Sequence, residues 1–167
     1  HWLRTMCNPP LSSAALCDRL TMSGLEVEEA APAAPPFAHV VVARIDAVTA
    51  HPDADRLRVC TVDVGAREKL AIVCGAPNVA VGMLAPCALE GAVLPGGLAI
   101  KRATMRGVES HGMLCSAKEL GIDEDASGLL ALDPTLVPGT PVREALALDD
   151  TLITLKITPN RADCLSV

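Results

Sequence analysis

The stretch from His51 to Ser116 constrains the fold of this chain more than any other part of it. Short runs rich in Val, Ile, Leu and Thr alternate there with Gly, Pro, Asn and Asp at intervals of roughly ten residues. This rhythm is typical of a small antiparallel barrel, because its strands are short and its turns need residues that reverse the chain. We therefore expect a β-barrel whose strands cover residues 40–48, 58–64, 70–74, 83–89 and 98–103.

The end of this stretch carries signals for two further elements. Ser116 and Glu119 form the S-x-x-E pattern of a capping box, and Gly121 suits a helix stop. These residues predict one short helix. Residues 128–132 predict another strand, and residues 134–141 are expected to be irregular.

Each end of the chain contains one alternating segment. Ser12 or Ser13 can cap a helix that stops at Gly24, and residues 25–29 and 151–157 alternate between apolar and polar side chains. A lone strand or hairpin is marginal in water. We therefore expect the two alternating segments to share one sheet.

The expected architecture is mainly β with short helices, in which a barrel is inserted into a small α+β subdomain. Residues 1–38 would begin the subdomain, 39–148 would form the barrel, and 149–167 would return to the subdomain. Residues 30–36 are rich in Ala and Pro and are interpreted as a linker. Asn160 with Asp163 could begin another helix. Because the chain begins at His1 rather than Met, we expect it to be a piece of a longer protein.

The composition narrows the possible functions. Trp2 and Phe37 are the only aromatic residues, so the core must be aliphatic, and the formal net charge is −6. Proteins that hold single-stranded nucleic acid without sequence preference stack bases on aromatic side chains, which the barrel lacks. A protein that binds folded RNA through its backbone remains possible, and its contacts would have to come from a local basic patch.

The densest basic run is KRATMR, which contains Lys101, Arg102 and Arg106. One interpretation is a solvated strand face; the other is a stripe that contacts phosphates, with Arg56 or Arg58 nearby across the barrel. Residues 119–125 are acidic and would repel RNA. The two segments must therefore point to different places if RNA binds.

Other chemistries find little support. His51, Asp53 and Asp55 lie in a turn whose spacing departs from a calcium loop, so we expect Asp side chains to cap the turn. The glycines at 91, 96 and 97 lack phosphate-loop spacing, and nothing aligns a catalytic triad. The seven cysteines lack a C-x-x-C pair, so we expect neither a metal site nor a disulfide. No membrane-length apolar run or signal peptide is visible.

The blocks HPDADRL, CTVDVG, IVCGAPNV, GAVLPGG and RGVESHGMLCS closely resemble the tRNA-binding OB-fold domain in the beta chain of bacterial phenylalanyl-tRNA synthetase. The segments 2–28 and 149–167 resemble the sequences that bracket this domain there. The resemblance covers almost the whole chain. It implies a cytoplasmic alpha2-beta2 heterotetramer that uses ATP and magnesium to join phenylalanine to its tRNA, with its active site in the alpha chain.

The resemblance also implies roles for particular residues. The expected tRNA-binding residues are Arg56, Arg58, Lys101, Arg102, Arg106, Ser110 and Ser116. The family's other signature positions fall on His51, Asp53, Asp55, Leu57, Gly75, Asn78, Gly107 and Met113. We expect no catalytic residue, cofactor, membrane or DNA partner for this chain itself. Two functions remain open: an accessory tRNA-binding module, and a structural module that packs against other synthetase domains.

Overall fold

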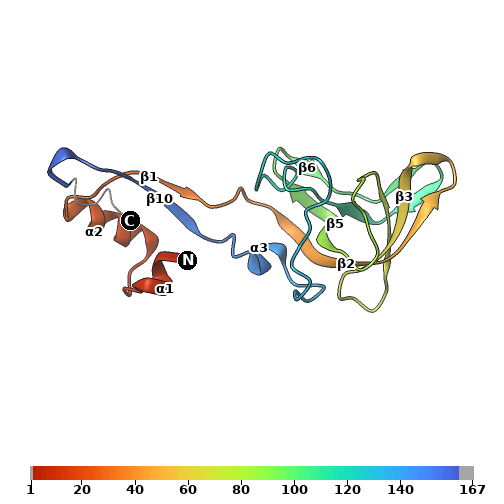
Figure 1. Ribbon diagram of the computed structural model, residues 1–167, viewed down its shortest axis with the longest axis horizontal. Coiled ribbons are helices and arrows are strands. Elements are labelled where there is room, and N and C mark those ends of the chain that lie inside the picture. The colour runs from red at the N-terminus through yellow and green to blue at the C-terminus, as the bar shows by residue number, and fades with distance from the viewer. Residues whose placement is uncertain (1, 162–167) are drawn as a thin grey trace. The chain divides into compact units, whose positions relative to one another are not determined.

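The computed structural model describes residues 2–161, which divide into two compact units (Figure 1). The barrel unit is Pro35–Leu146. The ribbon unit combines the described parts of His1–Ala34 and Ala147–Val167. The chain thus leaves the ribbon unit once, forms the barrel unit, and returns.

The barrel unit is built on one antiparallel sheet with the strand order β4-β3-β2-β5-β6, and β9 also pairs with β5. These strands are β2 (Ala38–His51), β3 (Ala54–Asp63), β4 (Leu70–Cys74), β5 (Leu84–Leu94), β6 (Leu98–Ala99) and β9 (Gly112–Leu114). The amide of His111, the residue before β9, donates to the carbonyl of Ala71 in β4 at 3.0 Å, which connects the two ends of the sheet. The sheet is therefore nearly closed, and the expected OB-fold-like barrel is confirmed.

A small hairpin adds to this barrel. Its strands are β7 (Ala103–Met105) and β8 (Val108–Ser110), and they form a separate two-stranded sheet. Arg106 and Gly107 make the turn between them, with φ angles of 48° and 85°. A positive φ is easily adopted by glycine and seldom by arginine, so the arginine backbone must be held by its surroundings.

The barrel core is aliphatic, as the shortage of aromatic residues requires. Alternate residues of β2, β3 and β4 point inward, and Ile45, Val62 and Ile72 are completely buried. The thiol-bearing residues Cys60 and Cys87 are buried as well and act as small apolar residues. Such burial contributes about 1.5–3 kcal/mol for each large side chain, so this core is the main source of the barrel's stability.

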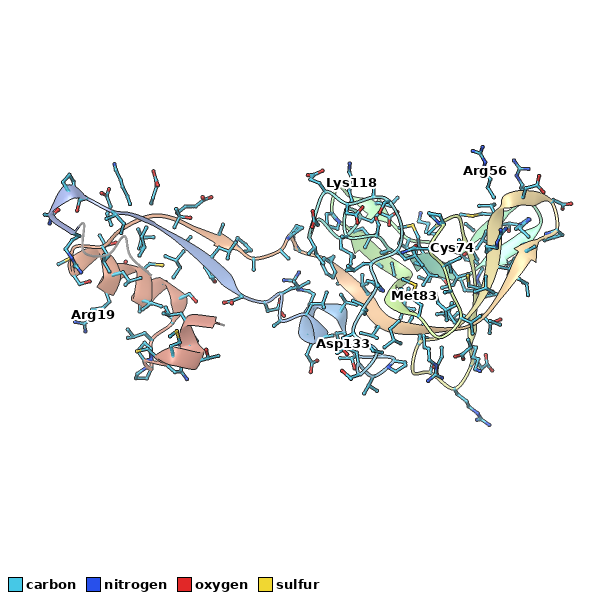
Figure 2. All side chains as sticks on the ribbon, viewed as in Figure 1. Arg19, Arg56, Cys74, Met83, Lys118 and Asp133 are labelled. Atoms are coloured by element: carbon cyan, nitrogen blue, oxygen red, sulfur yellow. The ribbon has the colours of Figure 1, made fainter. Side chains whose placement is uncertain are left out.

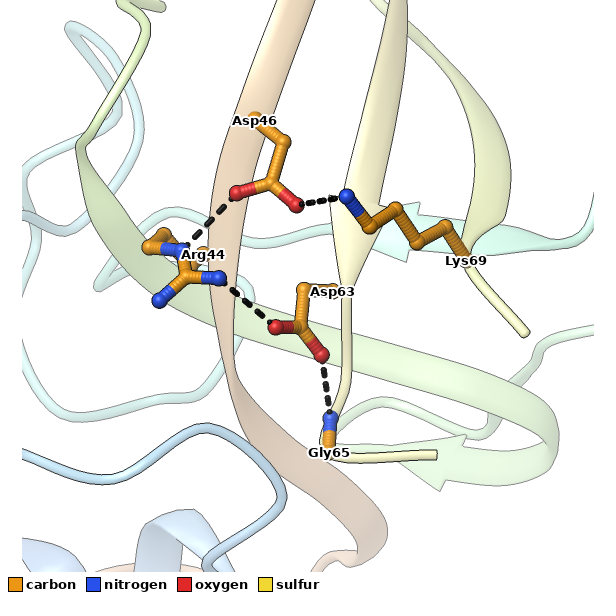
Figure 3. Close-up of polar contacts among 5 residues, drawn as sticks. All are labelled: Arg44, Asp46, Asp63, Gly65 and Lys69. Atoms are coloured by element: carbon orange, nitrogen blue, oxygen red, sulfur yellow. Dashed lines mark hydrogen bonds and ion pairs between the residues drawn. The ribbon is translucent and has the colours of Figure 1, made fainter. Parts of the chain in front are cut away.

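One end of the β2–β3–β4 sheet carries a chain of ion pairs (Figure 3). Arg44 bonds to Asp46 at 2.8 Å and to Asp63 at 2.9 Å, and Lys69 approaches the other oxygen of Asp46 at 2.9 Å. Asp63 also accepts from the amide of Gly65 at 2.9 Å. The two cations and the two anions of this cluster pair with one another and leave no net charge for a ligand. We therefore assign the cluster a role in the fold rather than in ligand binding.

The ribbon unit contains two helices and one two-stranded sheet. These elements are α1 (Trp2–Met6), α2 (Ser13–Met22), β1 (Glu26–Pro32) and β10 (Thr151–Lys156). β1 and β10 are antiparallel, and Glu26 lies opposite Lys156. The prediction that these distant segments share a sheet is confirmed. Ser12 caps α2 by accepting from the amide of Ala15 at 3.2 Å, as its sequence predicts.

Three local predictions are wrong. The capping-box bonds between Ser116 and Glu119 form, but the chain makes only a turn, which Gly121 closes with a φ of 64°. Residues 128–132 hydrogen-bond to the barrel without forming a strand. Residues 30–32 extend β1 instead of starting a linker, because a proline at the end of an edge strand needs no amide hydrogen.

Two smaller differences concern the elements near these segments. The strand expected at 98–103 is divided between β6 and β7, with residues 100–102 outside both. A short helix, α3 (Val142–Ala145), was not predicted. Arg143 of α3 stacks over the ring of Phe37 at 5.1 Å and donates to the carbonyl of Pro35 at 2.8 Å, which attaches α3 to the start of β2. The helix proposed from Asn160 and Asp163 extends outside the described residues.

Candidate nucleic-acid interface

A groove of about 740 Å³ opens on the barrel unit, and we call it the methionine groove. Met105 of the β7–β8 hairpin and Met113 of β9 line it, together with Leu57 of β3 and Leu129. Residues 75–77 form another part of its wall. Most of the lining is therefore apolar, and its two methionine side chains are flexible, which suits contact with ribose and base surfaces better than readout of base edges.

His51 fixes the hairpin side of this groove. Its Nδ1 accepts from the amide of Asp53 at 3.1 Å, so in the neutral ring the hydrogen is on Nε2, which donates to the carbonyl of Met105 at 3.0 Å. His51 is buried at the end of β2. The imidazole therefore caps the turn that we expected the Asp53 and Asp55 carboxylates to cap. A ring reaches both the turn and the hairpin, which a short carboxylate cannot do.

Asn78 fixes the side of the groove that contains Leu129. Its amide side chain accepts from the amide of Leu129 at 2.8 Å and donates to the carbonyl of Leu129 at 2.9 Å. A Cβ added at Gly128 would lie within 2.6 Å of two Asn78 side-chain atoms, so this close approach requires glycine. Sequence reasoning singled out Asn78 but missed residues 126–129, which line the groove. Gly128 was the signal that could have revealed them.

A second, smaller groove of about 560 Å³ adjoins the first through residues 75–77, which line both. Asp55, Arg56 and Arg58 line this part. Arg56 extends away from the β2–β3 hairpin into solvent (Figure 2). On the methionine groove itself, Lys118 is the lining cation, and its Nζ lies 3.7 Å from a carboxylate oxygen of Glu124. We call these two adjoining grooves together the joined groove. Cationic side chains therefore line both of its parts.

Glu119 lines the same groove as Met105, so the expectation that the acidic segment 119–125 and the KRATMR run point to different places is wrong. The Glu119 carboxylate accepts from the amide and the hydroxyl of Ser116.

Two arginines near this groove are partly used by the fold. Arg58 donates from Nη1 to the carbonyls of Asp55 and Leu57 at 3.0 and 3.1 Å. Arg106 donates from Nη1 to the carbonyl of Asp53 at 3.0 Å, which holds the hairpin turn against the β2–β3 turn. Each guanidinium has five N–H donors, so further donors remain for an anion.

The KRATMR run does not form one continuous stripe. Met105 lines the methionine groove and Arg106 braces its hairpin, whereas neither Lys101 nor Arg102 lines the groove. Arg102 lies 3.8 Å from Glu90 of β5, which partly neutralises it. The structure therefore separates the predicted cations into a hairpin group and a pair beside β5 and β6.

The two predicted serines serve the fold. The hydroxyl of Ser110 donates to the carbonyl of Gly112 at 2.9 Å and accepts from the amide of Val73 at 3.1 Å, and only 1% of the residue is exposed. The amide and hydroxyl of Ser116 donate to Glu119 at 2.6 and 2.9 Å. Ser110 therefore joins β4 to β8, and Ser116 stabilises a turn that lines the groove.

Among residues 2–161, no group of three or more His, Cys, Asp or Glu side chains is placed to hold a metal ion. Within the same residues, every helix is too short or too polar to cross a bilayer. The two adjoining grooves, of about 740 and 560 Å³, are the concave surfaces on which we build the candidate site.

Residues 40–141 match the family described as "Putative tRNA binding domain". The chain belongs to this tRNA-binding domain family. The matched residues contain nearly the whole barrel unit, including both grooves and the cations beside them.

Three curated relatives of this tRNA-binding domain are phenylalanine–tRNA ligase beta subunits. Those of Bordetella parapertussis and Dechloromonas aromatica are 62% and 61% identical over 166 residues, and that of Methylococcus capsulatus is 58% identical over 166 residues. Each match covers 99% of this chain and 21% of the relative. The chain therefore spans about a fifth of the length of these relatives.

Solved structures give weaker similarity. The C-terminal domain of Plasmodium vivax p43 has a TM-score of 0.47 and 22% identity, covering 61% of this chain and 57% of its own. A MetRS-related protein from Pyrococcus horikoshii has a TM-score of 0.44 and 21% identity, covering 61% and 86%. Family membership rests on the sequence match.

Proposed function

We propose that this chain is an accessory tRNA-binding module of a phenylalanine–tRNA ligase beta chain. The family match over residues 40–141 supports RNA binding, and the 58–62% identity to such beta subunits supports this parent enzyme. The parent would be a cytoplasmic heterotetramer of two alpha and two beta chains that attaches phenylalanine to tRNA. We assign its ATP and magnesium chemistry to other parts of that assembly.

The joined groove is the surface that we propose for RNA. Arg56 and Lys118 would contact phosphates at its two parts, and the apolar wall around Met105 would pack on a ribose or base. Arg58 and Arg106 would add their remaining donors. Because the lining lacks aromatic side chains and the net charge is −6, the binding should be weak, sensitive to salt and tolerant of sequence.

The test is a titration of the chain with tRNA over a range of salt concentrations. Wild type should bind at low salt. The double variant Arg56→Ala with Lys118→Ala should bind more weakly, and the slope of its log affinity against log salt concentration should be shallower by about 0.9 for each duplex phosphate contact that is lost. The double change Lys101→Ala with Arg102→Ala tests the alternative surface beside β6. Arg67→Ala, an exposed arginine between β3 and β4, is the matched control and should change neither quantity.

The second candidate function is a structural module that packs against other synthetase domains. The exposed side chains of Val93 and Leu98, at 52% and 50%, favour it because they leave apolar surface at the β5–β6 hairpin. Absence of tRNA binding by wild type at low salt would select this function. Retained binding by both double variants would instead place the RNA surface elsewhere on the chain.

A further inference from the structure

The two parts of the joined groove differ in charge. Arg56, Arg58 and Asp55 line the smaller part, so its side chains carry one net positive charge. The methionine groove is lined by one cation, Lys118, and one anion, Glu119, so its charges cancel, and most of its remaining wall is apolar. The joined groove therefore offers a site for an anion at one part and a site for an apolar group at the other.

Arg56 is the lining arginine that the fold uses least. Among residues 2–161 its exposed side chain has no hydrogen-bond or ion-pair partner, whereas Nη1 of Arg58 donates to carbonyls of its own turn. Figure 2 shows Arg56 and Lys118 projecting on the same side of the barrel unit, with Cys74 of the groove lining between them in that view. A strand of RNA that crosses the joined groove would therefore meet a cation at each part.

Met105 leaves an apolar side chain open to solvent in the methionine groove. The residue is 42% exposed, although His51 and Arg106 hold its hairpin in place through hydrogen bonds. Met113 lines the same groove from β9. A thioether is polarizable and makes favourable contacts with aromatic rings. A planar base lying against these two methionines would therefore cover apolar surface that water otherwise contacts.

A base inside a duplex cannot present its face to this wall. Its faces are stacked on neighbouring bases and its Watson–Crick edge is paired, whereas an unpaired base leaves faces and edge open. Both bonds from Ser116 end on Oε2 of Glu119, so its Oε1 remains to accept an N–H group from such an edge. The lining of the methionine groove thus fits an unpaired base better than a paired one.

We propose that the joined groove holds one unpaired nucleotide of an RNA, with its base against Met105 and Met113 and its phosphate at Arg56. This inference rests on the proposed function and specifies which part of a folded RNA the site takes. The methionine groove, at about 740 Å³, lies within the roughly 300–1,000 Å³ typical of sites for small molecules, so its size suits a single nucleotide. Each of the four unpaired bases has an N–H donor on its Watson–Crick edge, so the binding stays tolerant of sequence.

The test compares three short RNA duplexes of the same sequence by fluorescence anisotropy at low salt, with tRNA titrated alongside. One duplex has a single bulged nucleotide, one has an abasic residue at the bulge, and one is fully paired. The whole wild-type chain should bind the bulged duplex about 2- to 10-fold more tightly than the abasic one, as expected for contacts between thioethers and an aromatic ring. Because the abasic duplex keeps the same phosphates and the same bulge, this ratio isolates the contribution of the base.

Two methionine variants provide the matched comparison. Met105→Gln keeps the length of the side chain and removes its apolar end, so it should bring the ratio toward one. Met22→Gln is the control, because Met22 is 85% exposed on α2 of the ribbon unit, and it should leave the ratio unchanged. If Met105→Gln fails to fold, the wild-type ratio still decides the proposal.

The outcomes separate this inference from the function on which it rests. A wild-type chain that binds tRNA but shows no preference for the bulged over the abasic duplex would overturn the inference alone. A chain that binds none of these RNAs, tRNA included, would overturn the proposed function together with it.

Discussion

The barrel unit and the ribbon unit use the same kinds of residue and reach different degrees of burial. The barrel unit surrounds Ile45, Val62 and Ile72 completely. In the ribbon unit, among the residues described, Ala34 is the one apolar residue that is almost completely buried, although Ile153 and Leu155 are partly covered. The difference arises because six strands can close around a core, whereas a two-stranded ribbon with a helix covers one face incompletely.

This difference determines where each unit can carry function. In the barrel unit, a rigid sheet holds groove residues such as Met113 of β9, and side-chain bonds from His51 and Asn78 set its walls. Loops positioned by a rigid scaffold are favourable places for binding sites. The ribbon unit has no comparable scaffold among its described residues, so we place the RNA contacts on the barrel.

The largest test of the comparison is truncation of a core residue in each unit. Ile72→Ala should cost about 2–5 kcal/mol, because the closed core cannot collapse fully around the lost atoms. Ile153→Ala in β10 should cost about 1 kcal/mol or less, since partial burial makes fewer contacts to lose. Hydrogen exchange at increasing urea concentrations measures the free-energy cost of each substitution in its own unit. Equal costs would mean that the ribbon unit is as well packed as the barrel unit.

A smaller effect is expected at the groove wall. Asn78→Ala leaves the amide and carbonyl of Leu129 without their side-chain partners and should cost about 1–3 kcal/mol. Hydrogen exchange at the Leu129 amide should accelerate, while the amide of Val62 in β3 should remain as protected as in wild type.

Asn78→Asp is the matched control for this substitution. It keeps the side-chain oxygen that accepts from the Leu129 amide and replaces the NH2 group that donates to the Leu129 carbonyl. Hydrogen exchange at the Leu129 amide of this variant should therefore be faster than in wild type and slower than in Asn78→Ala. An unchanged rate in Asn78→Ala would show that residues 126–129 are held by other contacts.

The sequence predicted patterned elements better than the contacts that shape the groove. Strict alternation at 151–157 and 25–29, together with the need to bury one face, was enough to predict the pairing of β1 and β10. The loop at residues 126–129 has no periodicity, and its position depends on Asn78, about fifty residues away in the chain. Local patterns do not specify such long-range side-chain bonds.

The same limit explains the candidate binding residues. The basic character of KRATMR is evident in the sequence, but the extended strand β7 separates its two ends and places Arg106 at the hairpin turn. Ser110 was grouped with the cations because of its motif, and the structure uses its hydroxyl to join β4 and β8. Hydrogen-bond partners distant in sequence decide whether such residues face solvent.

The smallest expected effect concerns the ion pairs at the end of the barrel sheet. Hydrogen bonds from Arg44 and then Lys69 lower the pKa of the Asp46 carboxyl. A lowered pKa in the folded state means that the stabilisation is complete above the unfolded pKa of about 3.9 and disappears as the pH falls through the folded value. Asp46→Asn should therefore reduce stability by about 1 kcal/mol or less at pH 7 and by progressively less below pH 4.

Urea unfolding at pH 7 and at pH 2.5 measures this difference, with Glu68→Gln as a control. Glu68 is an exposed neighbour of Lys69, and its substitution removes the same charge without touching the Asp46 pairs. High salt should shrink the Asp46→Asn effect, because the partners Arg44 and Lys69 are exposed to solvent and the screening length falls to about 3 Å at 1 M. A cost that stays constant from pH 7 to pH 2.5 would mean that Asp46 contributes through packing and not through its charge, and the barrel unit would then depend on burial even at its charged end.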